Sequence, residues 1–486
     1  MESLSGRVIR SGLWVMALSV TARLLGTLHL LVLARLLTPY DFGLVGISLV
    51  MISLFESVSM TGTNLALIQR QERARDFFDT AWTLGLIRGV VMAGLMLALA
   101  PAAGTFFDSP DAVAIIRAMA LVPLIRVLTN IGVVEFRTEL TFAPHYRLFL
   151  SGAVADLCVA VPLALWHAGA WALVAGWLAS TAVRVVVSYG IHPYRPTLRL
   201  DRAEVKELAG YGRWILGSAA IRWLIANGVH ATVGRLLGVQ ALGLYQMAWR
   251  VAYLPSTEIT EAISGVTVTA YAKLQDSMAR VRLAYLRVLI TVALAATPIA
   301  VGVGVYGADL VRVVLGPRWG GIVAIVQVLV VAGLFRSIGA TTGPIFQGLD
   351  RPWLQTFVAV VELGILAALL VPLTLWMGPA GTALAATIGG VVGTTVALWR
   401  VSRLLGIRVG ELAPILGWPL LACLAFTLPR VWLLGPLDTL IGLAGSLALS
   451  AILYLATLAL LDRLALYDLS PVVPPAMGRW FPRRIR

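Results

Sequence analysis

Ionisable side chains occur inside the long apolar runs of this sequence, where water is scarce. An ionisable group at the middle of a bilayer costs about 2.5–3.5 kcal/mol even on a lenient scale, so each is a functional candidate. The residues concerned are Arg23, His29, Glu56, Arg126, Asp156, Arg222, His230, Arg250, Glu258, Glu261, Arg336 and Glu362. Arginine predominates among the cations, and guanidinium groups bind phosphate oxygens through paired hydrogen bonds. The pattern therefore predicts a cationic cavity that holds an anion.

Part of this set occurs twice at matching depth. The pairs are Arg23 with Arg222, His29 with His230 and Glu56 with Glu258, each within two positions of a 200-residue shift. Such pairs are expected where two related halves of a chain line one central cavity. An offset of one position turns a residue by about 100° on a helix, so equal depth does not establish an equal face.

We assign two roles within this set. The substrate-binding candidates are Arg23, Arg222, Arg250, Arg126, Arg336, His29 and His230. The candidates for coupling transport to H⁺ or Na⁺ are Glu56, Asp156, Glu258 and Glu261. We predict no other cofactor and no metal site.

Structural alternatives exist for several of these residues. Arg126 and Arg336 could form ion pairs with a neighbouring intramembrane acid, and the two histidines could be packing residues. The acids considered as partners are Asp156 and Glu362. Three further arginines, Arg88, Arg184 and Arg400, lie near the ends of apolar runs, from where their side chains can extend to the membrane surface.

A stretch of sequence that occurs twice positions these side chains. Residues 12–44 and 212–244 share Gly, Trp, Leu and Arg-Leu-Leu identities at a constant shift of 200 positions, and both end in Gly-Leu. Each copy consists of an apolar segment, a short turn with one arginine, and a second apolar segment. The chain is therefore predicted to be a duplicated membrane protein.

Composition predicts an all-α polytopic membrane protein. Hydrophobic residues make up 59% and charged residues 13% of the 486 residues, whereas a soluble domain is about half apolar and a quarter charged. Apolar runs of the roughly 20 residues that a helix needs to cross a bilayer recur throughout. We expect about 14 transmembrane helices, at residues 12–33, 42–63, 81–105, 112–133, 148–167, 170–190, 212–234, 241–266, 284–306, 321–343, 355–376, 379–400, 412–434 and 438–461.

The repeat divides these helices into two six-helix lobes. Because six is an even number, both lobes enter the membrane in the same direction, related by a pseudo-twofold axis along the membrane normal. Two C-terminal helices are left over as an addition. The expected divisions are an N-terminal lobe at 1–190, a cytoplasmic linker with a short helix at 191–211, a C-terminal lobe at 212–403, two additional spans at 404–463 and a basic cytoplasmic tail at 464–486.

Basic residues indicate the orientation of the chain. With the N-terminus in the cytoplasm, most of the arginines in loops and both lysines fall in inside segments, as the positive-inside rule requires. The outside loops hold only Arg35, Arg235, Arg312, Arg318 and Arg430. Both chain ends are expected to face the cytoplasm. The net charge of +14 then reflects topology rather than binding to nucleic acid.

The sequence carries no motif for catalysis. It has no G-x-x-x-x-G-K-[ST] sequence, which excludes ATP hydrolysis by a phosphate-binding loop. It has no His/Cys spacing typical of zinc and no convincing set of nucleophile, histidine and acid. The two cysteines, Cys158 and Cys423, lie within apolar runs and suggest no disulfide framework. We predict that the protein is not an enzyme.

Short motifs at the ends of spans resemble those of a known transporter family. They are Arg35-Leu36-Leu37-Thr38-Pro39-Tyr40-Asp41-Phe42-Gly43-Leu44, Leu67-Ile68-Gln69-Arg70, Leu315-Gly316-Pro317-Arg318-Trp319 and Gln347-Gly348-Leu349-Asp350-Arg351. In the order and spacing of these motifs, the chain resembles the polysaccharide transport (oligosaccharide flippase) family. This family is part of the multidrug/oligosaccharidyl-lipid/polysaccharide exporter superfamily.

The resemblance implies a flippase of the bacterial inner membrane. Its expected substrate is an undecaprenyl-pyrophosphate-linked oligosaccharide, a repeat unit of O-antigen, capsule or exopolysaccharide, which crosses by alternating access. Its expected partners are this lipid-linked substrate, membrane lipids, and polysaccharide polymerase and assembly proteins. The resemblance assigns no role to any particular arginine.

Two other functions remain open. A drug or small-molecule exporter of the same superfamily would be expected to present acids in its cavity, whereas arginine predominates here. A membrane glycosyl polymerase or ligase would need a large outside loop with catalytic residues, and the expected outside loops are short.

Overall fold

Helices account for all of the regular secondary structure in the described part of the chain. The computed structural model describes residues 21, 25–58, 77–138, 142–201, 220–254, 256, 267–268, 270–430 and 437–464. Within these ranges, ten helices are long and apolar enough to cross a membrane, which confirms the predicted class. The chain divides into two compact units, Met1–Gly243 and Leu244–Arg486. The limits expected for the lobes, the linker and the tail stay predictions.

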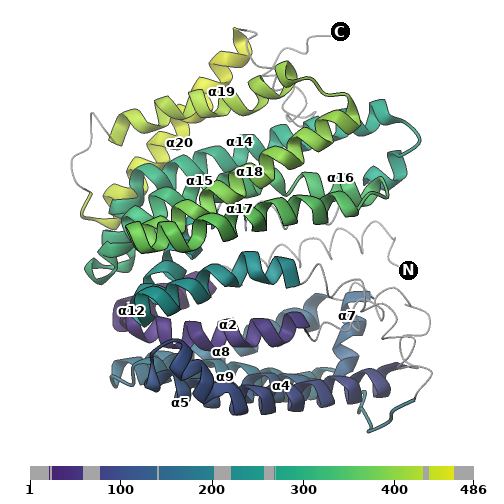
Figure 1. The fold of residues 1–486 in the computed structure, drawn as a ribbon, viewed down its shortest axis with the longest axis vertical. Coiled ribbons are helices and arrows are strands. Elements are labelled where there is room, and N and C mark those ends of the chain that lie inside the picture. The colour runs from purple at the N-terminus through teal and green to yellow at the C-terminus, as the bar shows by residue number, and fades with distance from the viewer. Residues whose placement is uncertain are drawn as a thin grey trace. The chain divides into compact units, whose positions relative to one another are not determined.

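An antiparallel hairpin and the helices that pack on it form the first unit. The elements are α2 (Pro39–Val58), α4 (Phe78–Phe106), α5 (Pro110–Met119), α6 (Leu121–Val127), η2 (Ile131–Val134), α7 (Glu135–Thr138), α8 (Phe142–Leu165), α9 (Ala170–Ile191), η3 (Leu224–Gly228) and the first part of α12 (Val229–Ala252). Helices α8 and α9 make the hairpin, and α2, α5 and α6 pack against α9. Figure 1 shows this set in purple, blue and teal.

A second hairpin has the equivalent place in the second unit. The elements are α14 (Met278–Leu310), η4 (Val311–Leu315), η5 (Pro317–Ile322), α15 (Val323–Gly339), α16 (Thr342–Gly348), α17 (Trp353–Met377), α18 (Pro379–Leu405), α19 (Val409–Leu428) and α20 (Leu440–Arg463). Helices α17 and α18 make the hairpin, and α15 packs between α18 and α14 (Figure 1). The same order of elements therefore occurs in both units.

The turns that connect the helices of the two hairpins have the same backbone conformation at one glycine. Gly169 directly precedes α9 with a φ of 59°, and Gly378 directly precedes α18 with a φ of 63°. Glycine adopts positive φ without the steric penalty of a side chain. The duplication predicted from residues 12–44 and 212–244 thus extends to the last hairpin of each half.

Prolines divide two of the expected spans. The fourth expected span is made of α5 and α6, with a break at Ala120. Pro123 lacks the N–H that would bond to the carbonyl of Met119, which weakens the helix at this point. The tenth is divided in the same way between α15 and α16, where Pro344 lies four residues after Ala340. The first, second, seventh, eighth and thirteenth expected spans lie partly outside the described residues.

The two additional C-terminal helices pack on α14. The Tyr306 hydroxyl of α14 lies 2.7 Å from the Ser450 hydroxyl of α20, and the Tyr454 hydroxyl donates to the Leu294 carbonyl over 2.9 Å. Phe426 of α19 contacts the Tyr306 ring edge-on. Their polar groups are thus satisfied inside the helix bundle, which favours burial of these aromatic side chains.

Candidate functional site

An ion pair between two helices forms the centre of a polar site in the first unit. The Arg126 guanidinium, in the last turn of α6, donates to the Glu56 carboxylate of α2. The Arg126 side chain remains 52% exposed and that of Glu56 34%. Arg88 of α4 lies within electrostatic range of both groups. Two guanidinium groups thus share one carboxylate, and the cluster has a net positive charge.

An aromatic side chain lies one helical turn from this pair. Trp223 Nε1 donates to the Ser53 hydroxyl over 2.9 Å. Ser53 precedes Glu56 by three residues, so both side chains lie on the same face of α2. Trp223 directly precedes the π-helical turn η3, a distortion often found at functional sites. The neighbouring Arg222 is exposed. We call Ser53, Glu56, Arg88, Arg126 and Trp223 the arginine–tryptophan site.

A second polar cluster in the first unit is centred on Asp156 of α8. His29 Nε2 lies 3.6 Å from the Asp156 carboxylate, and Arg184 of α9 is within electrostatic range of it. The Arg184 guanidinium carbon lies 5.1 Å from the centre of the Phe149 ring. One acid is therefore flanked by a histidine and an arginine in the middle of the α8–α9 hairpin.

Glycines make room for these side chains within the hairpin. A Cβ added to Gly176 would overlap Asp156, and one added to Gly152 would overlap Arg184. In the second unit the charged Glu362 of α17 faces Gly393 of α18, which is the order of Asp156 and Gly176 and the reverse of the order of Arg184 and Gly152. Each hairpin thus buries a charged side chain against a glycine of the partner helix.

The second unit carries a related arginine and acid. Arg336, in the last turn of α15, lies 210 positions after Arg126. Its guanidinium carbon is 5.7 Å from the centre of the Tyr253 ring, and Glu362 lies within electrostatic range of it. Tyr253 stacks on Trp249 with ring centroids 4.7 Å apart. An arginine beside an acid at the end of the equivalent helix is therefore common to both units.

The structure places the remaining predicted residues as follows. Arg250 is exposed, beside Trp249. His230 is buried, and its Nδ1 lies 2.9 Å from the Ala226 carbonyl. The residues Arg23, Glu258 and Glu261 lie outside the described part of the chain. Of the structural alternatives, Arg336 lies near Glu362 as considered, whereas Arg126 pairs with Glu56 instead of Asp156.

Sequence reasoning missed three side chains of these clusters. Arg88 and Arg184 were set aside as residues that reach the membrane surface, and Trp223 was not considered. Arg88 occurs ten residues after the start of α4, or about 15 Å along the helix axis. That depth could have been read from the sequence, whereas the side chains that face it could not. Arg400 contacts the rings of Phe357 and Trp399.

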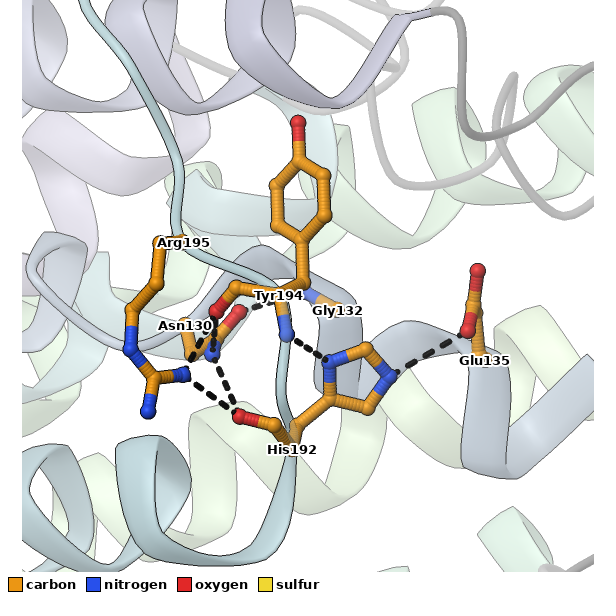
Figure 2. A network of polar contacts seen from close by, with 6 residues as sticks. All are labelled: Asn130, Gly132, Glu135, His192, Tyr194 and Arg195. Carbon is orange, nitrogen blue, oxygen red and sulfur yellow. Dashed lines mark hydrogen bonds and ion pairs between the residues drawn. The ribbon is translucent and has the colours of Figure 1, made fainter.

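A separate polar network ties the segment after α9 to the helices of the first unit (Figure 2). Asn130, which is fully buried, donates through Nδ2 to the Tyr194 carbonyl over 2.6 Å and accepts from the Gly132 amide over 2.9 Å. His192 Nε2 lies 3.2 Å from the Glu135 carboxylate. Side chains that precede η2 and begin α7 therefore bind the segment that follows α9.

The same segment is bound to the first turn of α4. The Tyr194 hydroxyl donates to Asp79 over 2.7 Å, and the Thr197 amide and hydroxyl both donate to this carboxylate over 2.8 Å. Burial, together with the bond to Asp79, raises the pKa of Tyr194 well above its usual value. Residues 192–201, which form the first half of the predicted linker at 191–211, are thus anchored to the first unit. We call this segment the anchor.

The long apolar helices of the described residues define a polytopic α-helical membrane protein. The chain belongs to the polysaccharide biosynthesis protein family, whose model matches residues 32–324. This confirms the family resemblance noted in the sequence.

Similar proteins are named for polysaccharide assembly and transport. The lipopolysaccharide biosynthesis protein WzxC of Escherichia coli (strain K12) is 29% identical over 361 residues, which cover 72% of this chain and 71% of that protein. The succinoglycan biosynthesis transport protein ExoT of Rhizobium meliloti (strain 1021) is 23% identical over 289 residues, or 59% of this chain and 58% of that protein.

Solved structures share the fold. The lipid II flippase MurJ in an inward closed conformation matches with a TM-score of 0.73 at 14% identity, covering 94% of this chain and all of that one. An inward-facing multidrug resistance MATE transporter matches with a TM-score of 0.61 at 18% identity, covering 79% of this chain and 95% of that one. The two solved structures show the fold, and the name of ExoT, a transport protein, agrees with the prediction that this chain is not an enzyme.

Proposed function

We propose that the protein is a flippase that moves an undecaprenyl-pyrophosphate-linked oligosaccharide across the bacterial inner membrane by alternating access. The observation that carries this proposal is the arginine–tryptophan site, in which two arginines share one acid beside an indole ring. The family membership supports transport of a polysaccharide precursor. The names of WzxC and ExoT support it further, because both refer to polysaccharide biosynthesis.

The site suits a molecule that has a pyrophosphate next to a sugar. The half-exposed Arg126 guanidinium can exchange its bond to Glu56 for phosphate oxygens, and Arg88 adds a second positive charge. Arginine presents a planar fork that matches phosphate. Trp223 supplies an apolar ring face of the kind on which the C–H face of a sugar packs. Glu56 pairs with Arg126 when the site is empty, so that this charge within the membrane has a partner.

Coupling to a proton gradient is assigned to His29 and Asp156. Their separation of 3.6 Å allows a proton on one group to change the charge of the pair. Arg184 adds a fixed positive charge beside Asp156, which disfavours Na⁺ at this position. The pair lies within the same unit as the arginine–tryptophan site.

Orientation and partners follow from the basic residues and the substrate. Both chain ends face the cytoplasm of a bacterial inner membrane, as the positive-inside distribution predicts. The lipid tail stays among membrane lipids while the sugar crosses. The partners are the lipid-linked oligosaccharide and the polymerase and assembly proteins that receive it.

The first test replaces Arg126 in a strain that lacks the chromosomal copy. We expect Arg126→Ala to lower surface polysaccharide about 10- to 100-fold, because one charge-assisted contact to phosphate is worth about 1.5–3 kcal/mol. Arg126→Lys should restore part of it. Measurements are surface polysaccharide, lipid-linked oligosaccharide retained inside, and the amount of protein in the membrane.

A matched control is Arg117→Ala, because Arg117 is an exposed arginine of the adjacent α5. It should leave export unchanged. Wild-type export by Arg126→Ala at normal protein level would refute the role of this residue. If removal of the whole protein left surface polysaccharide unchanged, the flippase proposal itself would fail and the drug-exporter alternative would replace it.

A further inference from the structure

Two glycines that are equivalent in the repeat each contact the other's helix within the first unit. Gly43 lies in α2, and Gly243 lies in the part of α12 that follows Gly238, whose φ of 86° interrupts the helix. A Cβ added to Gly43 would overlap the backbone carbonyl of Val239, and one added to Gly243 would overlap that of Pro39. The two backbones are therefore in direct contact, with no side chain between them.

This contact is its own counterpart under the repeat. A shift of 200 positions takes Pro39 to Val239 and Gly43 to Gly243, so exchanging the two copies turns each overlap into the other. A Cβ on Gly243 would also lie 2.9 Å from the Gly43 amide nitrogen. A local twofold axis therefore passes between the two glycines. We call residues 39–43 with 239–243 the glycine crossing.

The crossing joins the first turns of two equivalent helices. Helix α2 begins at Pro39, and the second copy resumes after Gly238. In the orientation of the proposed function, on which this inference rests, both first turns lie on the outer side of the membrane. We infer that the glycine crossing is the outer gate: the two helix ends meet when the transport path is closed, and separate when oligosaccharide leaves.

Residues 234 and 235, which precede the second half of the glycine crossing, make further contacts beside it. Gly234 has no room for a Cβ because the Phe107 ring would lie 2.9 Å away, and the Arg235 guanidinium carbon is 5.7 Å from the centre of the Phe106 ring. Both aromatic residues lie at the end of α4. The crossing itself is a contact of backbone groups, with the Val239 side chain, the Phe107 ring and one cation–π contact beside it, and small residues are what allow two helix backbones to approach this closely.

The experiment measures access from outside the cell and needs no oligosaccharide. Cys158 and Cys423 are replaced by alanine, so that no native thiol reacts. A cysteine introduced by Ser53→Cys serves as the reporter. Position 53 lies ten residues after Gly43 in α2, which is about 15 Å along the helix axis from the crossing. Intact cells of a strain without the polysaccharide pathway are treated with a membrane-impermeant maleimide. Gly43→Ala and Gly243→Ala are compared with the unmodified crossing.

We expect each alanine variant to raise the labelling rate of the reporter thiol about 5- to 150-fold, the range that a single overpacked contact provides. The two variants should agree, because the positions are equivalent. The matched control is Gly94→Ala in α4, where an added Cβ meets nothing within 4 Å. Unchanged labelling in both crossing variants, or an equal rise in the control, would overturn the inference.

A second measurement applies if an alanine variant does not accumulate. Tyr40 and Gln240 are exposed and follow Pro39 and Val239 directly. A short bis-maleimide joining Tyr40→Cys to Gln240→Cys should hold the crossing closed and abolish export, whereas each single cysteine treated with the same reagent should export. Undiminished export by the cross-linked chain would refute the gate. If labelling behaves as expected but deletion of the protein spares surface polysaccharide, the gate stands and the proposed substrate fails.

Discussion

Arg126 and Arg336 occupy the same place in the two halves, yet each lies beside an acid from a different helix. Arg126 pairs with Glu56 of α2, whereas Arg336 lies near Glu362 of α17. A guanidinium within an apolar span is costly without an acid nearby, so an acid close to it is expected in each unit. The helix that supplies the acid then determines which side of the guanidinium group is left open to bind another group. In the first unit this leaves half of the side chain exposed for an anion.

At the same scale, the His29–Asp156 pair makes a prediction about energy coupling. Asp156→Asn removes the charge that a proton would neutralise, so we expect export to fall about 5- to 150-fold and to become insensitive to collapse of the pH gradient. His29→Gln should weaken the same dependence. Export of lipid-linked oligosaccharide is followed with and without a proton–potassium exchange ionophore. Asp276→Asn, at an exposed turn, is the control. If Asp156→Asn retains full sensitivity to the ionophore, coupling resides elsewhere.

At the scale of elements, the α8–α9 hairpin depends on glycines opposite charged side chains. A Cβ at Gly176 would lie 2.8 Å from the Ala160 Cβ and would also overlap Asp156. Overpacking of this kind costs about 1–3 kcal/mol. We therefore expect Gly176→Ala to lower the apparent unfolding temperature in detergent by several degrees. Gly190→Ala, on the same helix with nothing within 4 Å of an added Cβ, should not lower it. Equal unfolding temperatures for both variants would contradict this packing.

At the scale of the whole molecule, the anchor holds the part of the chain that leads towards the second half against the first unit. Asn130 bonds to it from a fully buried position, and loss of a buried hydrogen-bond partner costs about 1–3 kcal/mol. Asn130→Ala should therefore release the anchor and speed tryptic cleavage after Arg195 and Arg199. The control is Thr395→Ala, whose exposed hydroxyl bonds only within α18. Resistance equal to wild type would show that the anchor is held without Asn130.

The sequence was sufficient for the class, the family and most of the long helices, because each depends on properties of consecutive residues. Apolar length predicts a span, and identities at a constant shift reveal a duplication. The sequence was not sufficient to predict which side chains contact one another. Depth along a helix follows from residue number, but the face depends on local distortions such as the π-helical turn after Trp223 and the breaks near Pro123 and Pro344. Glu56 was therefore not among the acids considered as partners of Arg126, and Arg88 was left out of the site.

The two hairpins also record how the duplicated halves have diverged. In the first, Arg184 of the second helix faces Gly152 of the first; in the second, Glu362 of the first helix faces Gly393 of the second. The position of the bulky residue and the sign of its charge have both been exchanged, while the space for one long side chain has remained. What the duplication preserved here is a volume between two helices. Within that constant volume, one half holds the side chain of an arginine and the other that of a glutamate.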